Sequence, residues 1–184
     1  MELKDTGEDI ARVLYTKDDI DRRLALMGAQ ISRDYAGKDL LLVGVLKGAI
    51  MVMADLSRKI SVPLKMDWMA VSSYGASTKS SGVVRILKDL NEDVKDKNVL
   101  IVEDILDSGL TLTWLKSNLE ARGAASVRIA AMLRKPEAVK ADIVPEYIGY
   151  DIPNEFVVGY GLDYAEHYRH LDFIGTLAPH VYGG

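Results

Sequence analysis

An acidic segment that follows a run of apolar residues is the part of the sequence best suited to chemistry. After the apolar residues 99–102 come two adjacent carboxylates, Glu103 and Asp104, a third at Asp107, and then a short Ser-Gly-Leu-Thr turn. Hydroxyls and closely approachable backbone N–H groups at the start of a helix form a typical phosphate site. Carboxylates repel phosphate, so we interpret the three acids as contacts for sugar hydroxyls, a metal ion or a proton in transit.

The same segment also has a structural interpretation. Asp107 could cap the helix through its side chain, and the remaining acids could lie in solvent. We favour the phosphate site because the strand, the acid pair, the third acid and the Ser-Gly-x-Thr turn occur in this order. The Gly-x4-Gly-Lys-Ser/Thr pattern of a P-loop is absent from the sequence, so a phosphate site of another kind is expected.

Two further polar segments also follow apolar runs. Leu46-Lys47-Gly48 comes after residues 40–45, and Arg134-Lys135-Pro136 comes after residues 127–132. The carboxyl ends of parallel strands meet at one edge of a sheet, where ligands gather. The three polar segments are therefore expected to converge on one site.

The elements that position these segments alternate between strands and helices. Apolar residues at helical spacing predict a helix over residues 17–36. Further helices are expected over residues 49–59 and 111–122, and strands over residues 40–45, 65–71, 99–102 and 127–132. This alternation predicts an α/β fold with an open, mainly parallel sheet flanked by helices.

Two segments lie outside this alternation. Residues 72–82, rich in Ser, Gly and Thr, predict a mobile loop. From residue 147 onward, short apolar runs with Gly and Pro predict a small irregular hood. We therefore expect residues 1–184 to form a single domain, with a core over about residues 9–145 and a C-terminal hood over about residues 146–184.

Composition and charge narrow the classes of protein. The 184 residues carry a net charge of -4, 48% are apolar, and none is cysteine. Disulfides and thiolate metal sites are therefore excluded, and general attraction to nucleic acid or an anionic membrane is not expected. The acidic first ten residues do not resemble a secretory signal, and the longest apolar stretch is interrupted by Lys47 and Asp55. A cytoplasmic protein is expected.

The segment from Val102 to Thr111 closely resembles the phosphoribosyl-pyrophosphate signature of type I phosphoribosyltransferases. Over about residues 9–182 the chain is similar to the bacterial hypoxanthine branch of this family, most selectively from Phe156 to Arg169. The resemblance implies purine salvage: transfer of 5-phosphoribosyl from phosphoribosyl pyrophosphate to hypoxanthine and guanine, giving IMP or GMP. It also implies Mg2+ as cofactor, small molecules rather than nucleic acid or membrane as partners, and a homodimer or homotetramer.

The resemblance assigns the phosphate and metal contacts residue by residue. Glu103 and Asp104 would contact the ribose hydroxyls directly or through Mg2+, and Asp163 would face a second Mg2+. The 5′-phosphate would be held by Asp107, Ser108, Gly109, Leu110 and Thr111. The pyrophosphate side would be formed by Lys47, Gly48, Ser73, Tyr74 and Arg169. Ser108 stands where Thr is common, and the hydroxyl is kept.

The resemblance also assigns the chemistry at the purine. Asp107 would act as general base on the N7 proton. Lys135, with three donors and no acceptor, would match the 6-carbonyl of hypoxanthine or guanine and mismatch the amino group of adenine. Phe156 would stack on the ring and the Val157 backbone would bond to its edge, with Asp163 nearby. Arg134 occupies a position that is often acidic in bacterial relatives, so the charge next to Lys135 differs from the charge in those relatives.

Structural alternatives to these roles stay open. Lys135 could lie on a solvated loop, and Phe156 could belong to the core. Asp163 could be a buried structural acid, Lys47 a surface lysine at a helix start, and Arg169 a partner in a surface salt bridge.

Other functions stay open as well. A nucleotide-sensing regulator that binds RNA or DNA needs a basic face, which the net charge of -4 disfavours. Related transferases act on xanthine, adenine or pyrimidines; Lys135 and Phe156 disfavour the last two, while xanthine shares the 6-oxo group. A pyrophosphokinase would be longer and two-lobed. A purely structural protein would give no reason for so many polar groups at strand ends.

Overall fold

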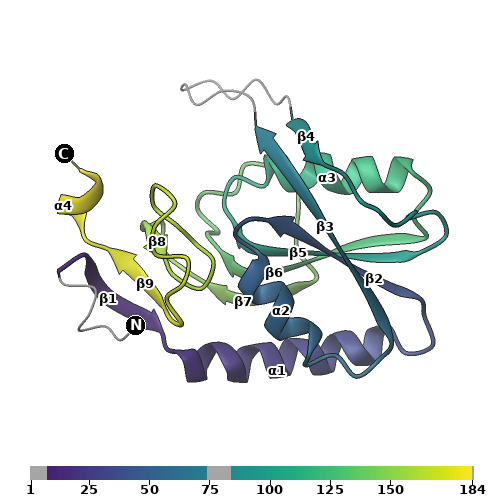
Figure 1. Ribbon diagram of the computed structural model, residues 1–184, viewed down its shortest axis with the longest axis horizontal. Helices are drawn as coiled ribbons and strands as arrows, with labels where there is room; N and C mark the ends of the chain where they lie inside the picture. The colour runs from purple at the N-terminus through teal and green to yellow at the C-terminus, as the bar shows by residue number, and fades with distance from the viewer. Residues whose placement is uncertain (1–7, 74–83, 184) are drawn as a thin grey trace.

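Strands and helices alternate along most of the chain (Figure 1). The structure is a computed structural model that describes residues 8–73 and 84–183. Its elements are β1 (Ile10–Tyr15), α1 (Lys17–Asp34), β2 (Leu40–Leu46), α2 (Ile50–Ser57), β3 (Leu64–Ser73), β4 (Val84–Lys88), β5 (Asn98–Leu106), α3 (Leu110–Ala121), β6 (Ser126–Arg134), β7 (Tyr147–Asp151), β8 (Val157–Val158), β9 (Ile174–Leu177) and α4 (Pro179–Tyr182).

The strands form two sheets. The larger has six strands in the order β4-β3-β2-β5-β6-β7, and all neighbouring pairs are parallel except β3 and β4. The smaller has three antiparallel strands in the order β1-β9-β8 and lies at the left end of the molecule in Figure 1. The mainly parallel sheet flanked by helices confirms the predicted α/β class.

The central strand β2 shows why the large sheet is covered on both faces. Successive side chains of a strand point to opposite faces. Leu40 and Leu42 pack in one apolar cluster with the buried faces of α1 and α2, whereas Leu41 and Val43 pack in a second cluster with α3. A strand buried on both sides reads as a continuous apolar run, which is why this strand was predictable.

The first helix begins where the sequence predicts. The Thr16 hydroxyl accepts a hydrogen bond from the Asp19 N–H (3.2 Å), and the Asp19 carboxylate accepts one from the Thr16 N–H (3.0 Å). This reciprocal capping box satisfies two N–H groups at the helix start. The helix ends at Asp34, two residues earlier than predicted. Of the helices in residues 8–73 and 84–183, none is long and apolar enough to cross a membrane.

All four predicted strands end too early, β2 by one residue and β6 by two, and the early ends of β5 and β3 affect the site. β5 continues past Val102 to Leu106, because its backbone stays paired with β6 beyond the last apolar residue. The carboxylates Glu103 and Asp104 therefore lie within the strand and not after it. Similarly, β3 extends through Ser72 and Ser73, which pair with β4 and were expected to begin a loop. The remainder of that expected loop, residues 74–82, falls outside the described residues.

The expected boundary between core and hood at residue 146 does not follow the sheets. β7 comes after this boundary but pairs in parallel with β6, in the large sheet. β1 comes from the N-terminal part of the chain but pairs with β9 in the small sheet. The small sheet is therefore built from both ends of the chain.

Candidate functional site

The three polar segments meet at the carboxyl ends of β2, β5 and β6. A Cβ atom added at Gly48, after β2, would overlap the carboxylate of Asp104 in β5. The backbone N–H of Lys135, after β6, donates to the carbonyl of Leu106 at the end of β5 (3.0 Å). A cavity of about 260 Å³ opens here and is lined mainly by the segment from Glu103 to Gly109. The convergence expected at the carboxyl ends of the parallel strands is present.

The turn before α3 offers backbone N–H groups to an anion, and the first of them, that of Leu110, makes only a long hydrogen bond to the Ser108 hydroxyl (3.5 Å). Gly109 is the N-cap at φ 79° and, having no side chain, provides no side-chain cap. Asp107 thus does not take the structural role of a cap, and its side chain is 58% exposed. The turn is held instead by its own carbonyl, because Ser108 O accepts from the N–H groups of Lys140 (3.0 Å) and Ala141 (3.2 Å). Backbone N–H groups at a helix start are the kind of donor that holds a phosphate, and that role of the segment stays a prediction.

Burial disfavours the charged forms of the adjacent acids Glu103 and Asp104. Burial, followed by the neighbouring charge of Asp104, raises the pKa of Glu103 well above its ordinary value. Burial also raises the pKa of Asp104, although hydrogen bonds such as that from the Ile105 N–H (2.7 Å) act in the opposite direction. A cation or hydroxyl donors would relieve this repulsion.

Lys135 lies inside the site and not on a solvated loop. Its side chain is only 11% exposed, and its Nζ lies 3.7 Å from an Asp107 carboxylate oxygen. The neighbouring Arg134 turns to Asp151 instead, with Nε–Oδ1 and Nη2–Oδ2 distances of 2.7 and 2.8 Å. Asp151 compensates the positive charge of Arg134 through these two hydrogen bonds. Arg134 therefore does not take over the role assigned to Lys135 in the site.

On the other side of the site, cations and carboxylates form a connected group. Arg169 Nη2 lies 3.0 Å from Asp163 Oδ1 and 3.4 Å from Glu166 Oε1, and Lys47 Nζ lies 2.9 Å from Glu166 Oε2. Arg169 Nη1 also donates to the Gly161 carbonyl (2.8 Å). Its Nε is buried and has no hydrogen-bond partner within the described residues. Arg169 and Lys47 are thus brought together by Glu166, while their contact with pyrophosphate stays a prediction.

The sequence interpretation gave no role to Glu166. The spacing in the sequence could have indicated a role, because Glu166 precedes Arg169 by three residues and follows Asp163 by three. Residues at this spacing within a tight turn can share partners, as these three do.

The predicted purine platform packs against other aromatic residues. The Phe156 ring lies 5.1 Å from the Tyr182 ring at 23° and 5.6 Å from the Tyr164 ring at 87°. It remains 38% exposed, so it is not a core side chain. Val157 is buried in β8 and pairs with Thr176.

Of the last two predicted contacts, Ser73 and Tyr74, the structure describes Ser73. Ser73 is the final residue of β3, opposite Val84. Tyr74 falls outside the described residues.

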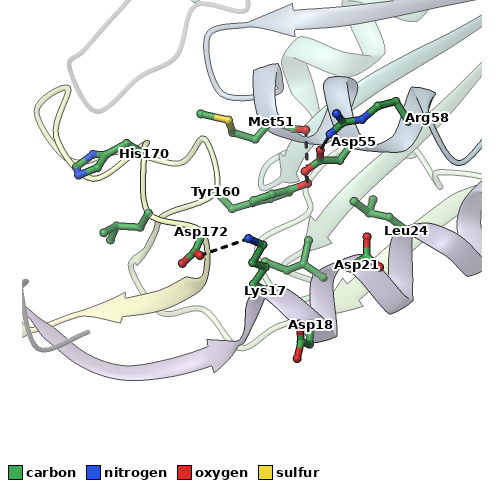
Figure 2. A pocket seen from close by; sticks show the side chains of 12 residues that line it. Lys17, Asp18, Asp21, Leu24, Met51, Asp55, Arg58, Tyr160, His170 and Asp172 are labelled. Carbon is green, nitrogen blue, oxygen red and sulfur yellow. Dashed lines mark hydrogen bonds and ion pairs between the residues drawn. The ribbon is translucent and has the colours of Figure 1, made fainter. Parts of the chain in front are cut away.

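A second cavity, of about 390 Å³, lies between α1, α2 and the loop that follows β8 (Figure 2). Tyr160 reaches across this region, and its hydroxyl donates to the Asp55 carboxylate on α2 (2.6 Å). Burial, followed by the Asp55 hydrogen bond, raises the Tyr160 pKa. This contact fixes the loop that carries Arg169 against α2, the helix that follows Lys47.

The strand-end site and the mainly parallel sheet are those of a phosphoribosyl-transferring protein. The profile of the phosphoribosyl transferase domain matches residues 15–165, and the chain belongs to this family. It is 57% identical over 180 residues to the hypoxanthine-guanine phosphoribosyltransferase of Mycobacterium tuberculosis (strain ATCC 25618 / H37Rv), covering 95% of this chain and 89% of that protein.

Solved structures agree with this membership. A hypoxanthine phosphoribosyltransferase from Staphylococcus aureus matches with a TM-score of 0.96 at 47% identity, covering 100% of both chains. Trypanosoma cruzi hypoxanthine phosphoribosyl transferase matches with a TM-score of 0.91 at 39% identity, covering 96% of this chain and 95% of that one. The latter structure concerns the role of its C-terminal region on the oligomeric state and enzymatic activity.

Proposed function

We propose that this protein is a purine-salvage enzyme that transfers 5-phosphoribosyl from phosphoribosyl pyrophosphate to hypoxanthine and guanine. The products are IMP or GMP and pyrophosphate. The observation that carries this proposal is the pair formed by the largely buried Lys135 and the accessible Asp107, 3.7 Å apart beside a phosphate-binding turn. Family membership and the relatives' names support the same reaction.

The sugar phosphate is held by the turn and the acids before it. The N–H groups at the start of α3, with the Ser108 and Thr111 hydroxyls, bind the 5′-phosphate. Glu103 and Asp104 accept hydrogen bonds from the ribose hydroxyls, which lowers the repulsion between the two carboxylates. The ring of the sugar therefore lies over the end of β5.

The purine is recognised by donors and acceptors at two of its edges. The Lys135 ammonium donates to the carbonyl at position 6, and adenine would place an amino group against it. Asp107 takes the proton from N7 as N9 bonds to ribose C1 and the bond from C1 to the pyrophosphate oxygen breaks. Phe156 and the Val157 backbone hold the plane of the base.

The pyrophosphate leaves on the side of Lys47, Gly48, Ser73, Tyr74 and Arg169. The Arg169 guanidinium and the Lys47 ammonium offset the charge that develops on the departing oxygens. The buried Nε of Arg169, which has no hydrogen-bond partner among residues 8–73 and 84–183, gives a donor for one of them. The close approach of Gly48 to Asp104 brings this backbone next to the ribose contacts.

The carboxylates fit Mg2+ that arrives with its substrate. No three His, Asp or Glu side chains gather as a metal cage within residues 8–73 and 84–183, so the protein alone offers few ligands. Glu103 and Asp104 nevertheless have raised pKa values that a cation would offset, and Asp163 lies across the site. Mg2+ retains waters and binds substrate phosphates through few carboxylates. When bound, it stabilises the charge on the leaving pyrophosphate.

The proposal includes the cellular compartment and the oligomeric state of the enzyme. We place the reaction in the cytoplasm, since a highly charged sugar phosphate does not cross a membrane unaided. We also propose a homodimer or homotetramer, which light scattering of the purified chain would distinguish from a monomer.

Nucleotide formation tests the function. The protein is mixed with phosphoribosyl pyrophosphate, Mg2+ and, separately, hypoxanthine, guanine, xanthine or adenine, and the products are separated by chromatography. We expect IMP and GMP to form and AMP not to form. Absence of both IMP and GMP, or equal use of adenine, would contradict the proposal.

A further inference from the structure

Glu166 lies in a tightly built turn. Ala165, Glu166 and Tyr168 have φ angles of 49°, 67° and 74°, in the left-handed region that residues with a Cβ seldom adopt. The turn is held by the Glu166 N–H, which donates to Asp163 Oδ2 (2.9 Å), and by two backbone hydrogen bonds between Tyr164 and His167 (3.2 and 2.9 Å). Uncommon backbone angles concentrate at functional sites, where surrounding contacts maintain them. The position of the Glu166 backbone is therefore fixed by the turn.

From this turn Glu166 bridges two cations that come from distant parts of the chain. Its Oε2 lies 2.9 Å from Lys47 Nζ, and its Oε1 lies 3.4 Å from Arg169 Nη2. With Asp163 included, the group contains two positive and two negative side chains and has no net charge. A pyrophosphate approaching Lys47 and Arg169 thus meets cations whose charge is already compensated.

Both sides of the bridge are fixed by other contacts. The Tyr160 hydroxyl donates to Asp55 on α2 (2.6 Å), and the Gly161 N–H donates to the Arg169 carbonyl (2.9 Å). Lys47 directly precedes the turn into α2, so its backbone is held at a set distance from the loop that carries Glu166. The side chains are freer, since Lys47 is 66% exposed and Glu166 is 63% exposed. Such an exposed pair is readily exchanged for another anion.

We propose that Glu166 is a positioning residue that takes the place of pyrophosphate between Lys47 and Arg169. In the empty site its carboxylate holds the two cations facing each other. When pyrophosphate binds, its oxygens displace the Glu166 carboxylate, and when pyrophosphate leaves, the carboxylate returns. Glu166 therefore weakens pyrophosphate binding and favours its release. This inference rests on the proposed function, which assigns the leaving group to Lys47 and Arg169.

The substitution Glu166→Gln tests the inference because it removes the charge and keeps the shape and a hydrogen-bond acceptor. Magnesium pyrophosphate is titrated into the purified enzyme in a calorimeter. Loss of an exposed ion pair shifts an equilibrium by about two- to fivefold, so we expect Glu166→Gln to bind pyrophosphate more tightly by about the same factor. The Michaelis constant for phosphoribosyl pyrophosphate and the inhibition constant for pyrophosphate should fall in the same direction.

A matched control removes the same charge elsewhere. Glu120→Gln changes a carboxylate on α3 that lies 4.0 Å from Lys116, and its pyrophosphate affinity should remain within about twofold of the parent, as for a distant exposed pair. In a Lys47→Met background the gain from Glu166→Gln should shrink, because the two residues act through one contact. Circular dichroism confirms that each variant is folded.

The outcomes distinguish a failure of the proposed pyrophosphate site from a failure of the role proposed for Glu166. If the parent enzyme does not bind magnesium pyrophosphate, the proposed site itself is wrong. If the parent binds it and Glu166→Gln binds it equally or more weakly, the site stands and the role of Glu166 is overturned. A gain that is equally large in the Lys47→Met background would also overturn it, since the effect would not pass through Lys47.

Discussion

The Lys135 ammonium nitrogen lies 3.7 Å from a carboxylate oxygen of Asp107, although the two residues follow different strands. The pair is unequal, with Lys135 11% exposed and Asp107 58% exposed. A buried donor and an accessible acceptor therefore stand side by side next to the turn that begins α3. One can select a carbonyl and the other can receive a proton. The specificity and the chemistry of the proposed reaction both depend on this pair.

Replacement of Lys135 should change the choice of base. In Lys135→Ala the donor that matches a 6-carbonyl is lost. A polar mismatch of this kind can discriminate between two substrates by about 10⁴-fold, so the preference for hypoxanthine over adenine should fall at least tenfold. The ratio of kcat/KM for the two bases measures this. Lys140→Ala, an exposed lysine in the following segment, is the control and should keep the parent ratio. An unchanged ratio in Lys135→Ala would move the selection to another residue.

Replacement of Asp107 should affect turnover more than binding. Asp107→Asn keeps the shape of the side chain but cannot accept the N7 proton, and a general base contributes about 10²–10⁴-fold. We expect kcat to fall at least tenfold while the affinity for IMP changes little, as followed by calorimetry. The exposed Asp142→Asn is the control. A variant with full turnover would remove Asp107 from the role of base.

Gly48 tests the packing of the pyrophosphate side against β5. An alanine Cβ there would overlap the Asp104 carboxylate, whereas a Cβ at Gly37 would meet no atom within 4 Å. Gly48→Ala should therefore lower kcat/KM at least tenfold, because small displacements of reacting groups are costly. Gly37→Ala should lower the melting temperature, since Gly37 has φ 73°, and should retain activity. Equal activity of the two variants would show that the Gly48 contact is not needed.

Asp67, in β3, predicts a pH dependence of stability away from the site. Burial acts to raise its pKa, but the backbone N–H groups of Glu92, Trp68 and Asn91 together lower it below the ordinary value. The folded protein then takes up the proton less readily than the unfolded chain. The stability that Asp67 contributes is thus present above its unfolded pKa of about 3.9 and is lost as the pH falls below it.

The substitution Asp67→Asn measures this contribution. At neutral pH it should lower the free energy of unfolding by about 1–3 kcal/mol, because a charged acceptor with several donors is lost. Urea unfolding followed at neutral pH and in acid should show the difference between the two proteins shrink as the pH falls. A difference that grows in acid would have the wrong sign for a lowered pKa.

Four strands of the large sheet, β3, β2, β5 and β6, were predictable because their evidence is local, whereas β4 and β7 were not predicted. The residues of β2 are apolar on both faces, and Thr16 and Asp19 mark the start of α1 within four residues of sequence. The end of β5 was not predictable in this way, because pairing with β6 continues through Glu103 and Asp104 after the apolar run has stopped. The small sheet was missed for a similar reason: β1 pairs with β9 across nearly the whole chain.

In the site, too, features that are local in the sequence were predictable and contacts between distant segments were not. The order of acids and small residues from Glu103 to Thr111 indicated a phosphate turn, and strand order indicated where Lys47 and Lys135 would join it. The contact of Phe156 with Tyr182 and the bridge made by Glu166 depend on side-chain positions that spacing alone does not define. These contacts required the three-dimensional arrangement of the loops.

A crystal structure of the protein with IMP and Mg2+ tests the central claim most directly. We predict that the phosphate lies against the backbone of residues 108–111, with the purine carbonyl oxygen within hydrogen-bonding distance of Lys135 Nζ. A nucleotide bound in the cavity between α1 and α2, or one with its base turned away from Lys135, would contradict the account.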